Sequence, residues 1–233
     1  MSSDPVVFLP GMMCDARLFA PQIADLSRDM VVAVAPITCG ARIEEIAENL
    51  LESLPARFAL AGLSMGGIVA MEALRRAPGR VTRLALMDTN PMPETEQSAE
   101  GYAPLIESLR NGRIAEAVEM LLGGEVLAPG PARAGVLALA GEMAHGLGAE
   151  TIIAQVHALK ARRDYQPVLS GCEIPTLLLC GAEDRLTPPR RHERMAAVMP
   201  RSRLVIVEGA GHLPVLEQPQ AVTAALRDWL SRG

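Results

Sequence analysis

A serine stands between two glycines in the string Gly62-Leu63-Ser64-Met65-Gly66. A Gly-x-Ser-x-Gly string suits a sharp turn from a strand into a helix, because the glycines leave room for close packing while the serine hydroxyl stays accessible. An apolar run, FALAGLS, leads into this serine, and an apolar helical pattern follows over residues 67–74. The alternative is a glycine-rich turn with an idle serine. We expect Ser64 to be a nucleophile at the end of a buried strand.

A serine hydroxyl needs a base to take its proton, and histidine is the side chain whose ordinary pKa suits that task near neutral pH. His145 and His157 lie within helical patterns, and His192 follows two arginines at an expected exposed helix start. His212 comes directly after the last strand pattern, in Gly-Ala-Gly-His. Parallel sheets gather catalytic groups in such loops, at the carboxyl ends of their strands. His212 is therefore the predicted base, and a loop histidine bonded only to backbone is the alternative.

The third group should be a carboxylate that orients the imidazole and stabilises its charged form. Asp184 lies four residues past a buried strand pattern that ends at Cys180. Asp88 ends the preceding strand pattern and could approach the same histidine by a longer path. Glu183 adjoins Asp184 and should point elsewhere. We predict that Asp184 is the acid, with Asp88 as the main alternative, either assisting or replacing it.

The cysteines suggest neither a disulfide framework nor a metal site. Cys14 is near the expected site and could be a nucleophile in principle, but no turn motif surrounds it. The spacing of the cysteines does not match paired metal ligands, and no two histidines stand at ligand spacing. We therefore expect no cofactor and no metal ion, and free thiols that are mostly buried. The four cysteines are Cys14, Cys39, Cys172 and Cys180.

The candidate residues must be positioned by a sheet, and the sequence contains six short apolar runs that could form one. Longer helical patterns separate the runs, which is the order of a parallel α/β sheet, and their continuous hydrophobicity indicates helices on both faces. Residues 43–54 and 222–230 show helical spacing of apolar side chains. The six runs are VVFLPG from Val6, MVVAVAP from Met30, FALAGLS from Phe58, RLALMD from Arg83, TLLLCG from Thr176 and RLVIVEG from Arg203.

Strand patterns disappear from Pro91 to Arg163, where several short helical patterns are separated by Gly and Pro. This segment is an insertion between strands. No internal repeat or low-complexity tract divides the chain, so we expect one domain over residues 1–233, with the insertion at about 91–163. The insertion is rich in Leu, Met, Ile and Val, with only Tyr102 and Tyr165 as nearby aromatic residues, which favours an apolar pocket.

Composition excludes several classes of partner. The 233 residues include 49% hydrophobic and 21% charged residues with a net charge of −5, so nucleic acid is not an expected partner. No apolar run reaches the roughly 18 residues of a membrane span. The start MSSDPVVFLPG has an aspartate where a signal peptide carries Lys or Arg, so we expect a cytoplasmic protein. The expected partner is a small molecule, and the sequence does not distinguish a monomer from a homodimer.

Four stretches together resemble the α/β-hydrolase superfamily of the small-esterase type, over nearly the whole chain. They are FLPG, GLSMGG, LLLCGAEDRLTPP and GAGHLPVLEQP. The resemblance implies a six-stranded sheet in the order 2-1-3-4-5-6 and a helical cap made by the insertion. It also implies an oxyanion hole formed by the backbone N–H groups of Met12 and Met65. One departure is Pro10-Gly11, where many relatives carry His-Gly, although backbone donors do not require that histidine.

The resemblance and the candidate residues together predict a serine hydrolase, a carboxylesterase that cleaves small or medium esters through an acyl-enzyme on Ser64. The same groups could serve a lactonase, a thioesterase or a carbon–carbon bond hydrolase, because the fold alone does not choose among them. A binding protein without turnover is the alternative outside enzymes. It is disfavoured because a binder has no need of an activated serine.

Overall fold

A parallel sheet forms the centre of the molecule in the computed structural model, which describes residues 4–231. The first three residues of the N-terminal stretch considered above therefore lie outside the described residues. The strands are arranged in the order β2-β1-β3-β4-β5-β6, and every neighbouring pair is parallel. This confirms the predicted fold class and strand order. The strands are β1 (Val6–Leu9), β2 (Val32–Val34), β3 (Phe58–Leu63), β4 (Val81–Met87), β5 (Thr176–Gly181) and β6 (Ser202–Val207).

Burial differs between the inner and outer strands of the sheet. Every residue of β1, β3 and β5 is buried, whereas β2 and β6 at the two edges are partly exposed. The fully buried strands are those whose sequence is apolar without alternation, because helices cover both faces of the sheet. The buried inner strands therefore form a rigid base, and the residues that follow them at their carboxyl ends are held in fixed positions.

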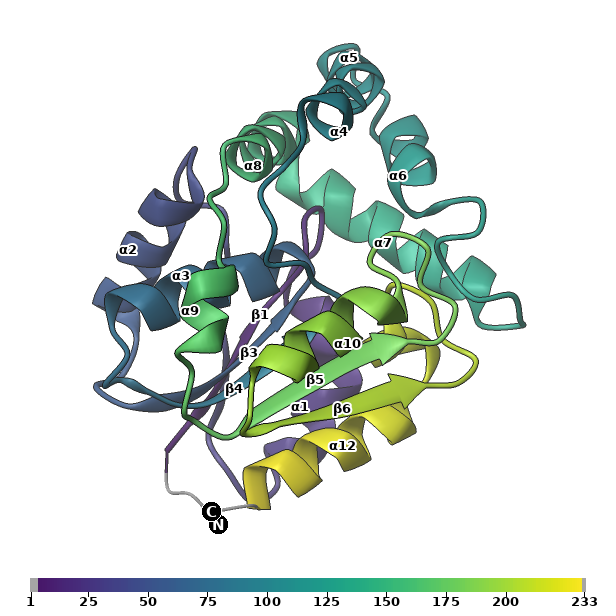
Figure 1. The fold of residues 1–233 in the computed structure, drawn as a ribbon. Coiled ribbons are helices and arrows are strands. Elements are labelled where there is room, and N and C mark those ends of the chain that lie inside the picture. The colour runs from purple at the N-terminus through teal and green to yellow at the C-terminus, as the bar shows by residue number, and fades with distance from the viewer. Residues whose placement is uncertain (1–3, 232–233) are drawn as a thin grey trace.

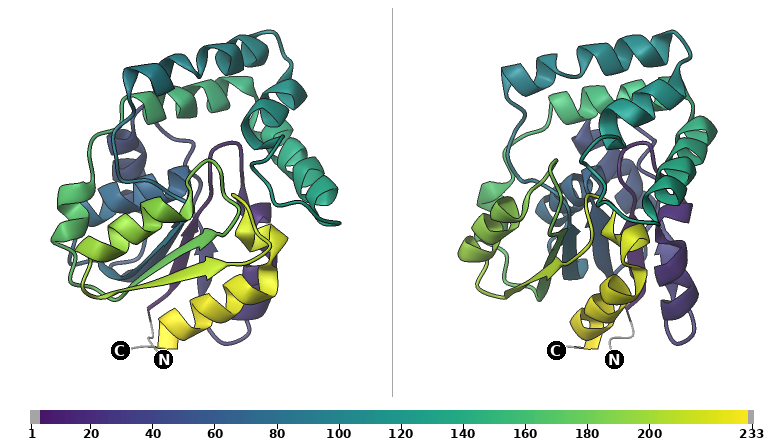
Figure 2. Two further views of the ribbon diagram at one scale, coloured as in Figure 1. Left: turned by 45° about the vertical axis from the view of Figure 1, so that its right-hand side comes forward. Right: turned by 90° about the vertical axis from the view of Figure 1, so that its right-hand side faces the viewer.

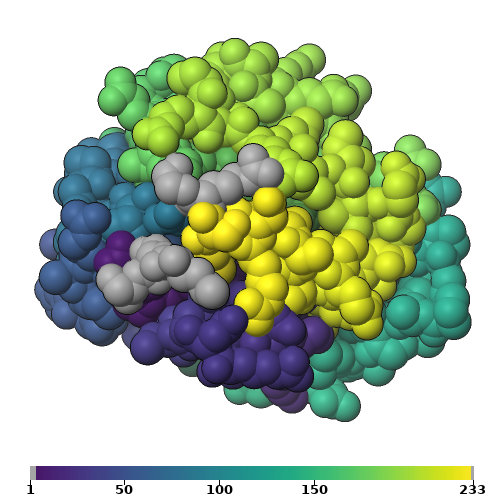
Figure 3. All heavy atoms as spheres, turned by 90° about the horizontal axis from the view of Figure 1, so that it is seen from below, coloured from purple at the N-terminus to yellow at the C-terminus, as the bar shows by residue number. Residues whose placement is uncertain are grey.

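Helices cover the sheet on two sides (Figure 2). On one side, α3 (Met65–Arg76) packs on β3, β4 and β1, while α10 (Pro189–Val198) packs on β5 and β6. On the other side, α1 (Ala20–Leu26) and α12 (Pro219–Ser231) lie side by side. Seen from below, α12 crosses the middle of the molecule, between the N-terminal segment that contains α1 and the segment that carries α10 (Figure 3). The remaining elements of the main body are η1 (Ala16–Phe19), α2 (Ile43–Ser53), α9 (Gln166–Ser170) and α11 (Pro214–Glu217).

A second group of helices lies above the carboxyl ends of the strands (Figure 1). They belong to the segment between β4 and β5, and we call them the cap helices. They are α4 (Glu96–Glu100), α5 (Ala103–Arg110), α6 (Ile114–Leu122), α7 (Arg133–Leu147) and α8 (Ala149–Lys160). Within residues 4–231, no single helix is both long and apolar enough to cross a membrane. Helices α7 and α8 reach that length and composition only as a pair, which is bent by 99°.

Candidate active site

Ser64 occupies the sharp turn between β3 and α3. Its φ of 54° and ψ of −116° place a non-glycine residue in a rarely populated region, which costs on the order of 1–3 kcal/mol and must be held by the surrounding packing. That packing requires the flanking glycines. A Cβ atom at Gly62 would lie 2.3 Å from the carbonyl oxygen of Gly66, and one at Gly66 would lie 2.1 Å from the carbonyl oxygen of Leu9. The Gly-x-Ser-x-Gly string is therefore a steric requirement of this turn.

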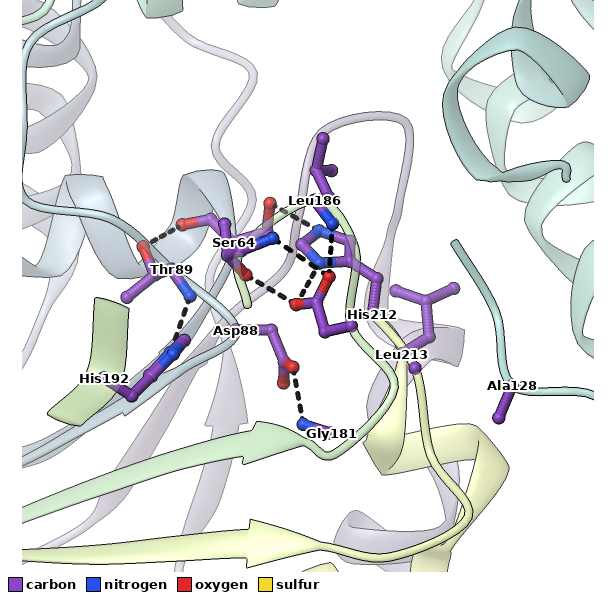
Figure 4. A network of polar contacts seen from close by, with 12 residues as sticks. Ser64, Asp88, Thr89, Ala128, Gly181, Leu186, His192, His212 and Leu213 are labelled. Atoms are coloured by element: carbon purple, nitrogen blue, oxygen red, sulfur yellow. Dashed lines mark hydrogen bonds and ion pairs between the residues drawn. The ribbon is translucent and has the colours of Figure 1, made fainter. Parts of the chain in front are cut away.

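Three groups predicted from distant parts of the sequence meet at this turn (Figure 4). His212 Nε2 lies 3.0 Å from Ser64 Oγ, and His212 Nδ1 lies 2.9 Å from Asp184 Oδ2. His212 is 3% exposed and Asp184 is 1% exposed, so water does not compete for their contact. The serine, imidazole and carboxylate thus form one chain of hydrogen bonds. Such a chain can pass the hydroxyl proton to the ring and stabilise the ring once it is charged.

Asp184 is held as an ionised carboxylate. Its Oδ1 accepts the backbone N–H groups of Leu186 and Thr187 at 2.8 and 3.0 Å, and its Oδ2 accepts the Thr187 hydroxyl at 2.6 Å. Burial by itself would raise the pKa of Asp184, but the charge of His212 and the hydrogen bonds from His212 and Thr187 outweigh burial. Together they hold this pKa well below its ordinary value. Asp184 therefore keeps its negative charge beside the imidazole.

Asp88, the rival carboxylate, lies directly after β4 but has a different environment. Its Oδ1 accepts the Gly181 backbone N–H at 2.9 Å, while its Oδ2 is buried and has no hydrogen-bond partner among residues 4–231. Burial, followed by the neighbouring charge of Asp184, raises the pKa of Asp88 well above its ordinary value. Asp88 therefore favours its neutral form. The contact to His212 Nδ1 comes from Asp184, and neither Asp88 nor Glu183 replaces it.

The two expected oxyanion donors belong to segments that adjoin Ser64. Met65 is the first residue of α3, and Met12 lies in the loop after β1. Within residues 4–231, the N–H groups of both methionines lack a protein acceptor. The loop packs on the nucleophile turn, since a Cβ atom at Gly11 would be 3.5 Å from Ser64 Cβ. The next residue, Met13, is fully buried with a φ of 64°, and its N–H donates to Gln155 Oε1 of α8 at 3.1 Å.

A buried glutamate that the sequence did not single out supports the histidine loop. Glu217 Oε2 accepts the N–H groups of Gly211 and Leu213, each at 3.0 Å, and its Oε1 accepts that of Ala128 at 2.7 Å. The His212 N–H donates to the carbonyl of Val126 at 2.9 Å. The loop carrying His212 is thus tied to the segment between α6 and α7. No local sequence pattern marks Glu217, because its role depends on contacts that form only in the folded chain. Two of its partners adjoin His212, and the third, Ala128, is 89 positions away.

His192 is the prediction that the structure corrects. It is fully buried rather than exposed at a helix start, because α10 packs on the sheet and turns this ring toward the end of β4. Its Nε2 accepts the Thr89 N–H at 3.1 Å, and the Thr89 hydroxyl donates to the carbonyl of Ser64 at 2.7 Å (Figure 4). Burial lowers the pKa of His192 to about 4, so the ring is neutral at pH 7. His192 therefore acts through Thr89 on the backbone of the nucleophile turn.

A cavity of about 1470 Å³ opens above this group, between the sheet edge and the cap helices, and Ser64, His212 and Met12 line it. Its lining is mainly apolar, as expected from the sequence, although several charged side chains contribute to it as well. Of the two aromatic residues expected nearby, Tyr102 lines the cavity, whereas Tyr165 is fully buried away from it. The lining is therefore amphipathic, and aromatic stacking has little part in it.

Cys14 also lines the cavity but does not suit the role of nucleophile. Burial, followed by the charge of Asp15, raises the pKa of its thiol to about 12. A thiol reacts as the thiolate, and this environment keeps the proton on sulfur. Cys172 and Cys180 are buried as expected, whereas Cys39 is exposed. Ser64 is therefore the better-placed nucleophile of the two candidates.

Within the described part of the chain, one group of side chains has the proximity of metal ligands. Asp88, Asp184 and His212 offer ligand atoms that lie within 4.8 Å of one another. Both ring nitrogens of His212 and both oxygens of Asp184 are already engaged in the hydrogen bonds described above. The hydrogen-bond chain accounts for this grouping.

Known proteins share both the sequence and the architecture. The family model described as the alpha/beta hydrolase family matches residues 6–226. The pimeloyl-[acyl-carrier protein] methyl ester esterase of Neisseria meningitidis serogroup B is 26% identical over 205 residues, covering 85% of this chain and 79% of the relative. The putative carbamate hydrolase RutD of Pseudomonas savastanoi pv. phaseolicola is 25% identical, covering 97% and 93%. A malate-bound thermophilic esterase from Thermogutta terrifontis is 28% identical with a TM-score of 0.88, covering 98% and 90%. The chain therefore belongs to the alpha/beta hydrolase family.

Proposed function

We propose that this chain is a serine hydrolase, a carboxylesterase that cleaves esters through an acyl-enzyme on Ser64. The observation that carries the proposal is the position of His212, whose two ring nitrogens contact Ser64 Oγ at 3.0 Å and Asp184 Oδ2 at 2.9 Å. One imidazole can then act as base toward the hydroxyl while the ionised carboxylate holds its tautomer and offsets its charge.

The reaction begins when His212 Nε2 takes the hydroxyl proton and Ser64 Oγ attacks the ester carbonyl carbon. The oxygen of the tetrahedral intermediate accepts hydrogen bonds from the backbone N–H groups of Met12 and Met65. A well-aimed donor of this kind contributes about 3 kcal/mol to the stability of the transition state. His212 then protonates the leaving alcohol, and the acyl group stays on Ser64. A water molecule, deprotonated by His212, then attacks the acyl carbon. The bond to Ser64 Oγ breaks, the carboxylic acid leaves, and His212 returns the proton to Ser64.

The similar proteins support ester-type bonds as the target. They include a methyl ester esterase, a putative carbamate hydrolase and a thermophilic esterase. A lactone contains the same acyl–oxygen bond in a ring, and a thioester replaces the leaving oxygen by sulfur, so the same groups could cleave either. A panel of open-chain ester, lactone, thioester and diketone substrates separates these activities by comparing kcat/KM.

The proposal is tested on Ser64→Ala, with Ser170→Ala as the matched control, because Ser170 also lines the cavity but its hydroxyl donates to the Pro167 carbonyl. We expect Ser64→Ala to lose at least about 10³-fold in kcat toward a 4-nitrophenyl ester, since the nucleophile is removed. Mass spectrometry should find a fluorophosphonate adduct on the Ser64 peptide of the wild type and of Ser170→Ala. Ester hydrolysis that survives in Ser64→Ala, or an adduct elsewhere, contradicts the proposal.

A further inference from the structure

The cavity that contains Ser64 carries positive charge on a chain whose net charge is −5. Two carboxylates, Glu94 and Asp164, stand against four arginines among its lining residues. Three of these arginines come from α10, at positions 190, 191 and 194, and the fourth is Arg162. A concave site with an excess of one sign of charge concentrates ligands of the opposite sign. The net charge of the cavity lining is therefore opposite in sign to the net charge of the chain as a whole.

Arg162 and Glu94 neutralise each other and do not contribute to this excess. Their side chains are 6% and 7% exposed and form a close ion pair. The Arg162 guanidinium also donates to the carbonyl of Met92 at 2.9 Å. The second carboxylate, Asp164, accepts hydrogen bonds from its neighbour Gln166. The arginines of α10 are therefore left without either of the carboxylates that line the cavity.

Arg191 is the cation that most needs a partner. It is half-buried, and within residues 4–231 its guanidinium forms neither an ion pair nor a hydrogen bond. Burial, followed by the charges of Arg162 and Arg190, lowers the pKa of Arg191, although an arginine stays charged in proteins. The carboxylates that act on it from a distance are Glu94 and Asp184, and both already have partners.

The position of Arg191 at the start of α10 makes its unpaired charge still less favourable. The first turn of α10 contains no acidic residue and carries Arg190 and Arg191. The N-terminus of a helix bears partial positive charge, so cations there are disfavoured and an anion is favoured. An anionic ligand in the cavity would meet a partly dehydrated guanidinium, the best side chain for recognising a carboxylate or phosphate in two-point contact.

Apolar side chains at the same cavity indicate what the rest of the ligand is like. Six large hydrophobic side chains are well exposed within the described residues, and four of them line this cavity. Those four are between 39% and 49% exposed: Met92, Met120, Leu186 and Val198. A ligand with an apolar chain would remove this surface from water. The cavity therefore suits a molecule that combines an apolar chain with an anionic group.

We propose that the substrate is an ester whose apolar chain carries a second, anionic group, a carboxylate or a phosphate-type group, and that Arg191 binds that group. The proposal rests on the proposed ester hydrolysis at Ser64 and names its substrate class. Arg190 and Arg194 extend the positive charge toward the mouth of the cavity, since both are exposed there. They therefore strengthen attraction over distance, while Arg191 makes the contact.

The test compares methyl esters of one chain length. Monomethyl adipate ends in a carboxylate, methyl 5-phosphonopentanoate ends in a phosphonate, and methyl 6-amino-6-oxohexanoate ends in a neutral amide, each after four methylene groups. Methanol release gives kcat/KM for each with the wild type, Arg191→Gln and Arg57→Gln. Arg57→Gln is the matched control, because it removes the same charge from an exposed site that precedes β3, at the other end of the strand from Ser64.

We expect the wild type and Arg57→Gln to prefer an anionic ester over the amide by about tenfold or more in kcat/KM, and Arg191→Gln to lose most of that preference. The preference should also weaken at high salt. The ester that is favoured most, carboxylate or phosphonate, identifies the anion. Equal kcat/KM for all three esters in the wild type, or an unchanged preference in Arg191→Gln, overturns the proposal.

Binding to the Ser64→Ala variant separates this inference from the proposed reaction. Calorimetry with intact monomethyl adipate and the neutral amide ester needs no turnover. Tighter binding of the anionic ester by about tenfold, lost in the double variant with Arg191→Gln, supports the anion site even if no ester is hydrolysed. Equal binding of the two esters rejects the site, whereas a wild type that hydrolyses no ester and gives no adduct on Ser64 rejects only the reaction.

Discussion

Two buried histidines lie at the same edge of the sheet, and their partners give them different properties. His212 places one ring nitrogen against the carboxylate of Asp184 and the other against the hydroxyl of Ser64. His192 instead accepts a backbone N–H from Thr89 through Nε2, and burial lowers its pKa to about 4. A carboxylate partner favours a charged ring, whereas an N–H donor favours a neutral one. Both rings are buried, but only His212 has a hydroxyl at one nitrogen and a carboxylate at the other, and this pair of partners suits it to act as a base.

Of the changes that test this comparison, removing the carboxylate that contacts His212 should have the largest effect on activity. Asp184→Asn takes away the charge that offsets the imidazolium and allows the amide to stabilise the wrong tautomer of His212. We expect kcat to fall by on the order of 10⁴-fold. Steady-state kinetics on a 4-nitrophenyl ester measure the loss, and circular dichroism checks that the variant is folded. A loss below tenfold would mean that Asp88 can support His212, and would undo the assignment of Asp184.

The sequence predicted where Ser64, Asp184 and His212 lie, because the order of strands and helices brings these three residues together. The apolar runs gave a parallel sheet, and Ser64, Asp184 and His212 each follow the carboxyl end of one of its strands. Loops in that position must share one edge, so their proximity follows from the order of elements alone. The prediction of the fold is confirmed, and the three side chains lie within hydrogen-bond distance, while their catalytic roles stay predictions.

The burial of His192 and its contact with Thr89 could not be predicted from local sequence patterns. The segment from Pro188 to Arg194 is polar, with prolines and arginines that are typical of an exposed helix start. Packing of α10 on β5 and β6 nevertheless buries one ring of this segment and leaves its arginine neighbours toward the cavity. Which face of a short polar helix is buried depends on tertiary contacts, here with β5, with β6 and with Thr89, which is 103 positions from His192. The same reason hides Glu217 and the charged lining of the cavity.

The neutral state of His192 should appear in the pH dependence of stability. Its pKa is about 4 in the folded chain against an ordinary value of 6.5, so between these values the unfolded chain binds a proton that the folded chain does not. The free energy of unfolding therefore decreases as pH falls from 7 to 4. The difference between these two pKa values corresponds to a contribution of about 3 kcal/mol to the change in the free energy of unfolding. Substituting a residue that cannot take up a proton should remove this contribution.

His192→Gln tests that contribution, because an amide oxygen can still accept the Thr89 N–H without titrating. Urea unfolding at pH 7 and at pH 4.5 should show that wild type loses more stability than the variant over this range. Parallel curves for the two proteins would mean that His192 is already charged in the folded chain, and the contrast with His212 would disappear.

A smaller effect is expected from the hydroxyl that joins His192 to the nucleophile turn. Thr89→Val keeps the shape of the side chain but removes the 2.7 Å hydrogen bond to the Ser64 carbonyl. We expect a loss of about 1 kcal/mol in the free energy of unfolding, with a few-fold decrease in kcat because the turn is less firmly held. Thr89→Ser is the matched control, since it retains the hydroxyl and should lose less activity than Thr89→Val. Equal kinetics for the two variants would argue that packing alone positions the turn.

The smallest change in activity is expected at the second aspartate. Asp88 favours its neutral form because burial and then the charge of Asp184 raise its pKa, so Asp88→Asn replaces one neutral group by another and keeps an acceptor for the Gly181 N–H. We expect kcat to stay within about threefold, since the charge beside His212 is unchanged. Stability should respond instead. The folded wild type holds a proton that the unfolded chain releases above pH 4, so its stability falls as pH rises through that window. Asp88→Asn lacks this loss and should gain stability relative to the wild type between pH 4.5 and 7.5 in urea unfolding, whereas a relative loss over that range would show that Asp88 is ionised in the folded chain.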